Sequence, residues 1–351
     1  MKPYEAAAYL TTFSLISTLL INSLLIYLTI FHIKLIHGPY KWMIVTFAAI
    51  GMIFSLDEAS VRPCIHNFNG SYVFFSLNQQ LPMGLLTFGT ACYGGFISIL
   101  LTFVSLQFLF RYFTLSGSPW IKTFRGWKVV IWILFVMTPS VFYTCCAYFF
   151  VSPDEYGDRY LEAELLEIYD LKIKKTPRFL IVAYDENGAL RLGALGFFTS
   201  TNVIVFSSFL IITICAIRMK KAMKTALKQM SERNRNLETQ FFKALLVQTA
   251  FPTILLVLPT GPVVILPYLD LKVSLQSGFL FAFFGLYPPM DGIAMMLIIT
   301  EYRRCVKSLI CRGKIGVESG GQHQLDNTIE MTSGVGVGER ARVVKATRSI
   351  S

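Results

Sequence analysis

Two prolines and an aspartate interrupt an otherwise apolar run near the end of the sequence. The segment reads Tyr-Pro-Pro-Met-Asp, and Asp291 is the only charged residue between positions 273 and 300. Pro288 and Pro289 lack a backbone N–H, so the carbonyl groups one turn earlier need partners outside the helix. In a membrane span the carboxylate costs about 2.5–3.5 kcal/mol at mid-bilayer, so it should face the interior of a helix bundle. Asn22 is its candidate partner, and both a switching role and a structural hydrogen bond fit the pattern.

A second polar pair, Arg111 and Tyr112, stands at the end of another apolar block. An arginine there can act as an interfacial anchor, with its stem on apolar surface and the tyrosine at headgroup depth. It can equally act as a switch that engages a neighbouring helix when the bundle rearranges. Pro252 lies in the middle of a later block and predicts a helix bend, because proline removes one backbone hydrogen bond there. Spacing alone leaves the anchor and the switch open.

Histidine and cysteine are not arranged for metal binding or catalysis. The four histidines are scattered, and the seven cysteines have no metal-ligand spacing. We therefore expect no enzyme activity, no catalytic residues, no metal and no cofactor. Cys64 falls in an expected outer loop, and a disulfide from it to Cys145 or Cys146 is left open, because sequence alone gives no distance between them.

The elements that position these residues follow from composition. The chain has 351 residues, of which 54% are hydrophobic and only 15% are charged, against about 25% charged in soluble domains. The apolar residues fall into seven blocks, each long enough to cross about 30 Å of hydrocarbon. The sequence therefore predicts an all-α membrane protein, a seven-transmembrane helix bundle. The expected spans lie near 8–31, 42–60, 83–110, 129–150, 193–217, 242–266 and 277–300.

Loop charge predicts the orientation of the bundle. Most of the 32 basic residues lie in 32–41, 111–128, 218–241 and 301–351. Basic loops face the cytoplasm, so the N-terminus is expected outside and the C-terminus in the cytoplasm. The net charge of +11 then faces anionic lipids and acidic partners, and nucleic-acid binding is a poor interpretation of it. The sequon at Asn69 falls in an outer loop, which predicts glycosylation there.

The segment after the last span is basic and amphipathic. Residues 301–312 predict a short helix on the cytoplasmic leaflet, which completes a seven-transmembrane domain of residues 1–312. Cys305 and Cys311 are placed for palmitoylation. Residues 313–351 are rich in Gly, Ser, Thr and charge, and predict a disordered cytoplasmic tail.

Several blocks resemble the Str class of nematode seven-transmembrane chemoreceptors, which includes odorant receptors. The most specific are LETQFFKALLVQTAFPTILLVLPTG in the sixth span and YPPMDGIAMMLIITEYRRCV in the seventh, and CYGGFISILLTFVSLQFLFRYFTL resembles the third span. The resemblance implies a receptor for a small-molecule odorant or metabolite that signals through a heterotrimeric G protein. It also implies the plasma membrane, and specifically the ciliary membrane of chemosensory neurons. The candidate G-protein coupling and switch residues are Arg111, Tyr112, Asp291, Pro252, Pro288, Pro289 and Asn22.

Three departures from the wider receptor pattern matter. Phe110 takes the place where an acidic residue usually precedes Arg-Tyr, so the usual intrahelical ion pair to Arg111 is absent. The loop 151–192 has no cysteine, so the usual tie to the third span cannot form. Gly292 replaces the proline that commonly follows the aspartate in the class, which leaves the helix kink to the two preceding prolines.

The ligand pocket and one alternative function stay open. Tyr93, Phe96, Asn202 and Tyr287 are guessed to line a pocket in the outer half, because the rotation of each helix is unknown. A seven-span transporter or ion channel without G-protein coupling is the alternative. A transporter would be expected to carry several intramembrane ionisable groups or paired broken helices.

Overall fold

The computed structural model describes residues 3–34, 36, 38–226, 231–269, 271, 273–275 and 277–308. Its contacts divide the chain into a unit Met1–Cys305 and a unit Val306–Ser351. Only 306–308 of the second unit fall in the described ranges, so the following account concerns the first. The tail 313–351 and Cys311 lie outside the described residues.

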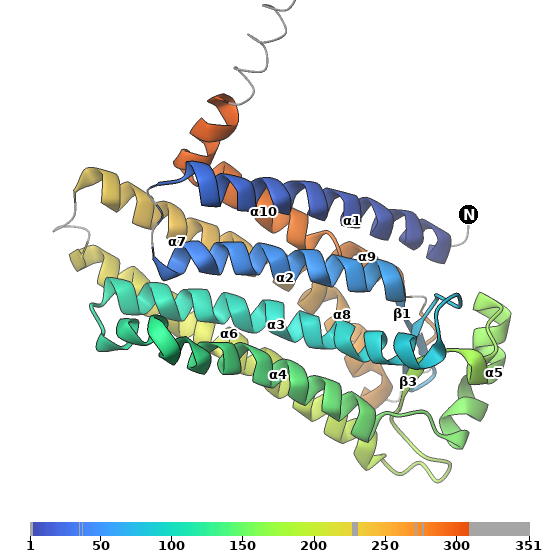
Figure 1. Cartoon of the computed structure of the whole chain (residues 1–351). Helices are drawn as coiled ribbons and strands as arrows, with labels where there is room; N and C mark the ends of the chain where they lie inside the picture. The colour runs from blue at the N-terminus through green and yellow to red at the C-terminus, as the bar shows by residue number, and fades with distance from the viewer. Residues whose placement is uncertain are drawn as a thin grey trace, which may run out of the picture. The chain divides into compact units, whose positions relative to one another are not determined.

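The predicted seven-helix bundle is confirmed. Among the described residues, seven helical segments are long and apolar enough to cross a membrane, and they run side by side in Figure 1. The third segment is central, since it packs against the second, fourth, fifth and sixth spans. The segments are Ala6–His32, Pro39–Val61, Met83–Leu115, Gly126–Phe150, Leu192–Lys224, Glu232–Leu269 and Leu280–Ile298.

Four of the spans are built from a single long α-helix. They are α2 (Pro39–Val61), α3 (Met83–Leu115), α4 (Val129–Phe150) and α6 (Leu192–Ala226). In the first span, α1 (Pro3–Tyr27) ends in the π-helical turn η1 (Leu28–His32). Short 3-10 turns, η2 (Pro119–Phe124) and η3 (Gly126–Lys128), lead from α3 into α4.

Proline divides the last two spans where the sequence predicts. The sixth span consists of α7 (Glu232–Pro252), the π-helical turn η6 (Thr253–Val257), α8 (Leu258–Ile265) and the 3-10 turn η7 (Leu266–Leu269). The regular helix gives way directly after Pro252, whose missing N–H removes one rung of the ladder. The seventh span is α9 (Phe279–Phe284) followed by α10 (Tyr287–Ile298), with Pro288 and Pro289 in the first turn of α10. A first-turn N–H has no helical partner, so proline is tolerated there.

One end of the bundle carries a sheet that the sequence analysis did not anticipate. Strands β1 (Pro63–Phe68), β2 (Ser71–Ser76) and β3 (Arg178–Val182) form an antiparallel sheet in that order. The β1–β2 turn has Asn69 at φ 39° and Gly70 at φ 75°. Such a pair at positive φ closes a tight hairpin, and Asn-Gly is the dipeptide that best tolerates it. The sheet thus joins the segment between the second and third spans to the loop 151–192.

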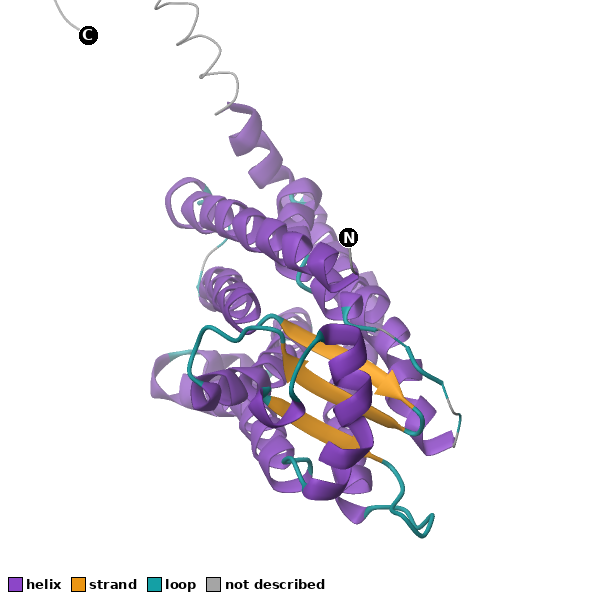
Figure 2. Cartoon of the chain, turned by 90° about the vertical axis from the view of Figure 1, so that its right-hand side faces the viewer, coloured by secondary structure: helices purple, strands orange, loops and turns teal. Residues whose placement is uncertain are grey.

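The helix α5 (Glu155–Tyr169) packs across the outer face of this sheet and ends shortly before the 3-10 turn η4 (Ile173–Lys175) (Figure 2). Asp154 caps its first turn by accepting a hydrogen bond from the N–H of Gly157 at 2.7 Å. We call residues 63–76 and 154–182 the cap, its side of the bundle the cap end, and the opposite side the Arg111 end. Cys64 is a buried free thiol in the cap. In α4, Cys146 is buried and Cys145 is exposed, and both are also free thiols, so the disulfide left open from the sequence is not formed.

Candidate functional site

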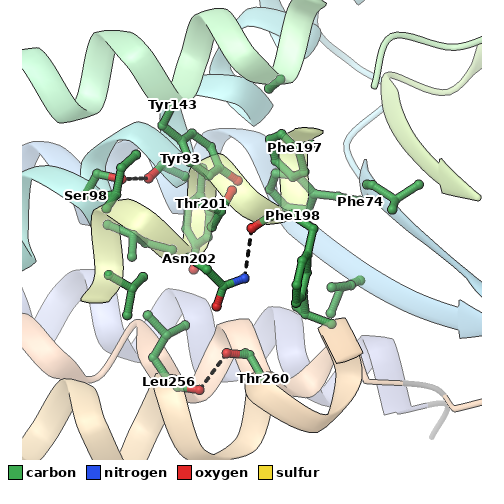
Figure 3. Close-up of a pocket in the computed structure, with 18 of the residues that line it drawn as sticks. Phe74, Tyr93, Ser98, Tyr143, Phe197, Phe198, Thr201, Asn202, Leu256 and Thr260 are labelled. Atoms are coloured by element: carbon green, nitrogen blue, oxygen red, sulfur yellow. Dashed lines mark hydrogen bonds between the residues drawn. The ribbon is translucent and has the colours of Figure 1, made fainter. Parts of the chain in front are cut away.

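A largely apolar cavity of about 200 Å³ lies beneath the cap. Its walls come from α3, α4, α6, the η6–α8 part of the sixth span, α9 and the sheet. Ser98, Thr201, Asn202 and Thr260 add hydroxyl and amide groups to a wall of aromatic and aliphatic side chains (Figure 3). A concave, apolar site with a few polar groups is the usual form of a small-molecule pocket.

Two of the four guessed pocket residues line the cavity. Tyr93 and Asn202 belong to its wall. Phe96 instead turns toward Phe54 of α2, with ring centroids 6.5 Å apart, and is not among the lining residues. Tyr287 is also not among them; it is fully buried and stacks on Phe284, with centroids 5.6 Å apart. Helix rotation decides these placements.

The sheet supplies cavity residues that the sequence analysis missed. Tyr72, Phe74, Phe179 and Ile181 all line the cavity from β2 and β3. Alternate residues of a strand point to opposite faces, so each strand sends every second side chain inward. The short apolar run at 178–182, which contains aromatic and β-branched residues, was the available signal.

Asp291 is buried and joins α10 to α7. Its Oδ2 accepts a hydrogen bond from Nε2 of Gln248 at 3.0 Å, and both side chains are almost fully buried. The expected partner, Asn22, donates instead to the carbonyl of Ala48 at 3.1 Å. The Oδ1 atom of Asn22 packs against Gly292, where a Cβ would lie 2.8 Å from it. Gly292, which replaces the usual proline, therefore lets α1 approach α10 closely. The Asp291 carboxylate then bonds to Gln248 of α7 and not to Asn22 of α1.

The break in the seventh span is held by neighbouring helices. The hydroxyl of Ser14 in α1 donates to the carbonyl of Gly285, one of the groups that the prolines leave without a helical partner. The Glu58 carboxylate of α2 is 1% exposed and packs directly where a Cβ at Gly285 would sit. A larger residue at that position would displace the Glu58 carboxylate.

Arg111 lies between two aromatic rings and pairs with an acid from another helix. Its guanidinium is 3.6 Å from the ring centroid of Tyr40 and 3.7 Å from that of Phe241. Nη1 donates to both carboxylate oxygens of Glu238 at 3.1 Å, and the arginine is 4% exposed. The guanidinium is thus buried, charged and paired, which a headgroup anchor would not be. Sequence analysis missed Glu238, although it stands in the family-like block LETQ.

The neighbours of Arg111 take other roles. Phe110 stacks on the Tyr40 ring, with centroids 5.8 Å apart, so the residue that replaces the usual acid completes an aromatic cluster. Tyr112 is half-buried under the guanidinium of Arg218, 5.9 Å from its ring centroid, and belongs to a different contact.

The sixth span is also tied to the residues that follow α10. Nε2 of Gln240 donates to Oγ1 of Thr300 at 2.9 Å, and the Thr300 N–H donates back to Oε1 of Gln240 at 2.8 Å. In the predicted amphipathic segment, 301–305 are helical within this unit, and Tyr302 is buried with its hydroxyl 2.6 Å from that of Thr29. Cys305 is half-buried.

The described residues contain no group of three or more His, Cys, Asp or Glu side chains that could hold a metal ion. A bent seven-helix bundle with a small apolar cavity at one end and a buried interhelical ion pair at the other has the architecture of a membrane receptor. The family model of serpentine-type 7TM GPCR chemoreceptors named Str matches residues 7–307. The chain belongs to this family of chemoreceptors, and it is a multi-pass membrane protein.

Individual relatives support the same family. The chain is 36% identical over 318 residues to the G-protein coupled receptor str-33 of Caenorhabditis elegans, which covers 88% of this chain and 91% of the relative. It is 26% identical over 291 residues to the serpentine receptor class r-10 of the same species, covering 80% and 84%. The corresponding receptor of Caenorhabditis briggsae is 26% identical over 289 residues, covering 79% and 82%.

Proposed function

We propose that this chemoreceptor binds a small external odorant or metabolite in the cavity beneath the cap and activates a heterotrimeric G protein at the Arg111 end. The basic residues of the loops gather at the Arg111 end, which supports placing that end in the cytoplasm and the cap outside. We propose that the protein is located in the plasma membrane of chemosensory neurons, in the membrane of the cilium.

The observation that carries this proposal is that one span links both sites. Leu256 and Thr260 line the cavity, and Glu238 of the same span pairs with Arg111. Glu238 and Leu256 lie about 27 Å apart along the helix axis at 1.5 Å per residue. The π-helical turn after Pro252 lies between them and supplies a bend at which the two halves can reorient.

The mechanism that follows is a shift between two packings. A ligand that contacts α3, α6 and the η6–α8 segment favours one angle at the bend over another, and it can shift the population only by that difference in affinity. The hydrogen bond from Gln248 to Asp291 lies close to the bend and holds α7 against α10, so it acts as the pivot. Movement of the α7 end then separates Glu238 from Arg111 and opens a surface for the G protein.

Further residues are proposed to shape the broken seventh span or to carry covalent modifications. Asn22, Pro288 and Pro289 shape the joint between α1 and the broken seventh span and so set its alternative packings. Asn69 is proposed to carry a glycan, since it stands at a hairpin turn of the cap. Cys305 is proposed to be palmitoylated, and the same proposal for Cys311 concerns a residue outside the described ranges.

The test is ligand-evoked guanine-nucleotide exchange in a heterologous cell that expresses the full chain. A panel of volatile compounds and small metabolites is applied, and exchange on Gα subunits is recorded alongside membrane current and compound uptake. At least one compound should evoke exchange, and Asp291→Asn should weaken that response at equal surface expression. Compound-evoked current or uptake without nucleotide exchange would favour the channel or transporter instead.

A further inference from the structure

The cap closes the cavity at its end with two packed layers. The inward face of the sheet, including Tyr72 and Phe179, forms the cavity wall. The opposite face packs on α5 through a buried apolar cluster that includes Val73, Leu161 and Leu165. A molecule arriving from the water at this end meets a sheet and a helix in succession.

Hydrogen bonds fasten the cap to the helices below it. Asn67 of β1 donates its side-chain amide to the carbonyl of Val263 in α8 at 2.6 Å. Ser277, just before α9, donates its hydroxyl to the carbonyl of Ile65 in β1 at 3.2 Å. Lifting the cap would break these bonds and expose the apolar inward face of the sheet to water, so entry through the cap is energetically costly.

The side wall between α6 and the sixth span is thinner. Among the described elements α6 packs chiefly against α3 and α4. No residue of η6 is fully buried, and Val263 is the only fully buried residue of α8. Asn202 lines the cavity and is nevertheless exposed, and a Cβ at Gly261, on the opposite side, would meet no atom within 4 Å. In Figure 3, Asn202 lies across the cavity from Thr260.

The part of this wall at the cap end is closed. The hydroxyl of Tyr268 in η7 donates to the carbonyl of Ala194 in α6 at 2.7 Å, and its ring packs on Phe198 with centroids 4.7 Å apart. The opening at Asn202 and Gly261 therefore lies further from the cap, among side chains that face hydrocarbon in a spanning bundle.

We propose that ligands enter the cavity sideways from the lipid bilayer, through the opening between α6 and the η6–α8 segment. This inference rests on the proposed ligand-binding function and specifies its ligand class: neutral small molecules that partition into membranes. A charged molecule would have to cross hydrocarbon to reach the opening, which is strongly unfavourable. Each added methylene raises the membrane concentration of a neutral molecule about fourfold, and so raises its supply to the opening.

The test uses a thiol inside the cavity and needs no known ligand. Ser98→Cys is nearly isosteric and places a thiol on the buried cavity wall of α3. Full-length protein in lipid vesicles is treated with N-methyl-, N-ethyl- and N-butylmaleimide, and separately with a charged sulfonatoethyl methanethiosulfonate. Labelling at position 98 is followed by mass spectrometry. Val203→Cys, which is 58% exposed on α6, calibrates the reactivity of a thiol within the bilayer.

Two further variants separate the side route from the cap. Gly261→Phe places a ring in the open space at the side opening, and Gly84→Phe is the matched control on α3, where a Cβ also meets nothing within 4 Å. Gly278→Cys has its Cβ 3.7 Å from that of Cys64, which suits a disulfide between β1 and the start of the seventh span. Oxidation then fastens the cap, and dithiothreitol releases it.

Side entry predicts that the maleimide rate at position 98 rises about fourfold per methylene at fixed aqueous concentration. The charged reagent should label far more slowly, Gly261→Phe should slow labelling, and Gly84→Phe should leave it unchanged. The oxidised Gly278→Cys variant should label as fast as the reduced one. The proposal would be overturned if oxidation of the Gly278→Cys variant abolished labelling at position 98. It would also be overturned if the charged reagent labelled position 98 as fast as the neutral maleimides, or if position 98 did not react while position 203 did. Because labelling needs no G protein, its failure is separate from failure of nucleotide exchange.

Discussion

Neutralising Glu238 is the sharpest perturbation of the proposed switch. Glu238→Gln keeps the shape of the side chain and one hydrogen-bond acceptor but removes the charge that faces Arg111 at 3.1 Å. Coulomb's law at an effective dielectric of about 20 gives about 5 kcal/mol as an upper bound for the pair. The Glu238 side chain is 17% exposed, and the two aromatic rings still hold the guanidinium, so the loss is smaller. A charged hydrogen bond contributes about 1.5–3 kcal/mol, which we take as the destabilisation of the resting packing.

That destabilisation raises the active-to-resting ratio about 10- to 100-fold, since each 1.4 kcal/mol is a factor of ten. The assay is basal guanine-nucleotide exchange without ligand, in membranes matched for receptor surface density. Glu232→Gln is the matched control, because Glu232 lies in the first turn of the same helix and is exposed. Glu238→Gln should raise basal exchange and Glu232→Gln should not. Normal surface density with unchanged or reduced basal exchange would refute the idea that this pair holds the resting state.

Three further predictions concern the Asp291–Gln248 hydrogen bond and the cap. Asp291→Ala should leave a buried glutamine amide unpaired, at a cost of about 1–3 kcal/mol, and should shift agonist potency more than surface expression in dose–response and cell-surface assays. Arg178→Ala removes the two hydrogen bonds, 2.6 and 2.8 Å long, that the guanidinium donates to the largely buried Asp158 carboxylate on α5. We expect this to destabilise the cap by about 3–5 kcal/mol, which faster cleavage of the cap in limited proteolysis would reveal. Burial lowers the pKa of His66 below its usual 6.5, against the opposing pull of Glu164, so the folded cap favours neutral histidine. Cap stability should therefore fall as pH drops below about 6.5, seen as faster amide hydrogen exchange in β1.

Each of these has a control and a contrary outcome. Equal loss of response and surface expression in Asp291→Ala would reduce its role to folding. Arg159→Ala removes a pair that is 73% exposed on the arginine and 3.6 Å long, so it should cost less than about 1 kcal/mol. Similar proteolysis of the Arg159 and Arg178 variants would contradict the assigned importance of the buried pair. His66→Gln should abolish the acid-dependent exchange, and persistence of that dependence would assign it to another group.

Local features of the sequence anticipated a large part of the fold. The seven spans follow from block length, because a helix must exceed the hydrocarbon thickness whatever its neighbours are. The breaks at Pro252, Pro288 and Pro289 follow from the missing N–H of proline, and the buried Asp291 follows from the cost of a lipid-facing carboxylate. The sheet was not predicted because β3 pairs with a strand far from it in the sequence, although Asn69-Gly70 is a local hairpin signal.

The rotation of each span about its own axis could not be predicted from the sequence. Tyr93 and Asn202 face the cavity while Phe96 and Tyr287 do not, and all four stand in spans that are apolar on every side. Lipid tails are as apolar as leucine, so the outward face of a span carries no polar stripe that would reveal its rotation.

The sequence by itself determined that this chain crosses a membrane seven times, where its helices break and which carboxylate must be buried. These properties depend on composition and backbone chemistry within a single span. Only the tertiary structure decided that Arg111 meets Glu238, that Asp291 meets Gln248 rather than Asn22, and that strands from two loops close over the cavity. Those contacts join residues far apart in sequence, and they depend on how each helix is rotated and how two distant strands align.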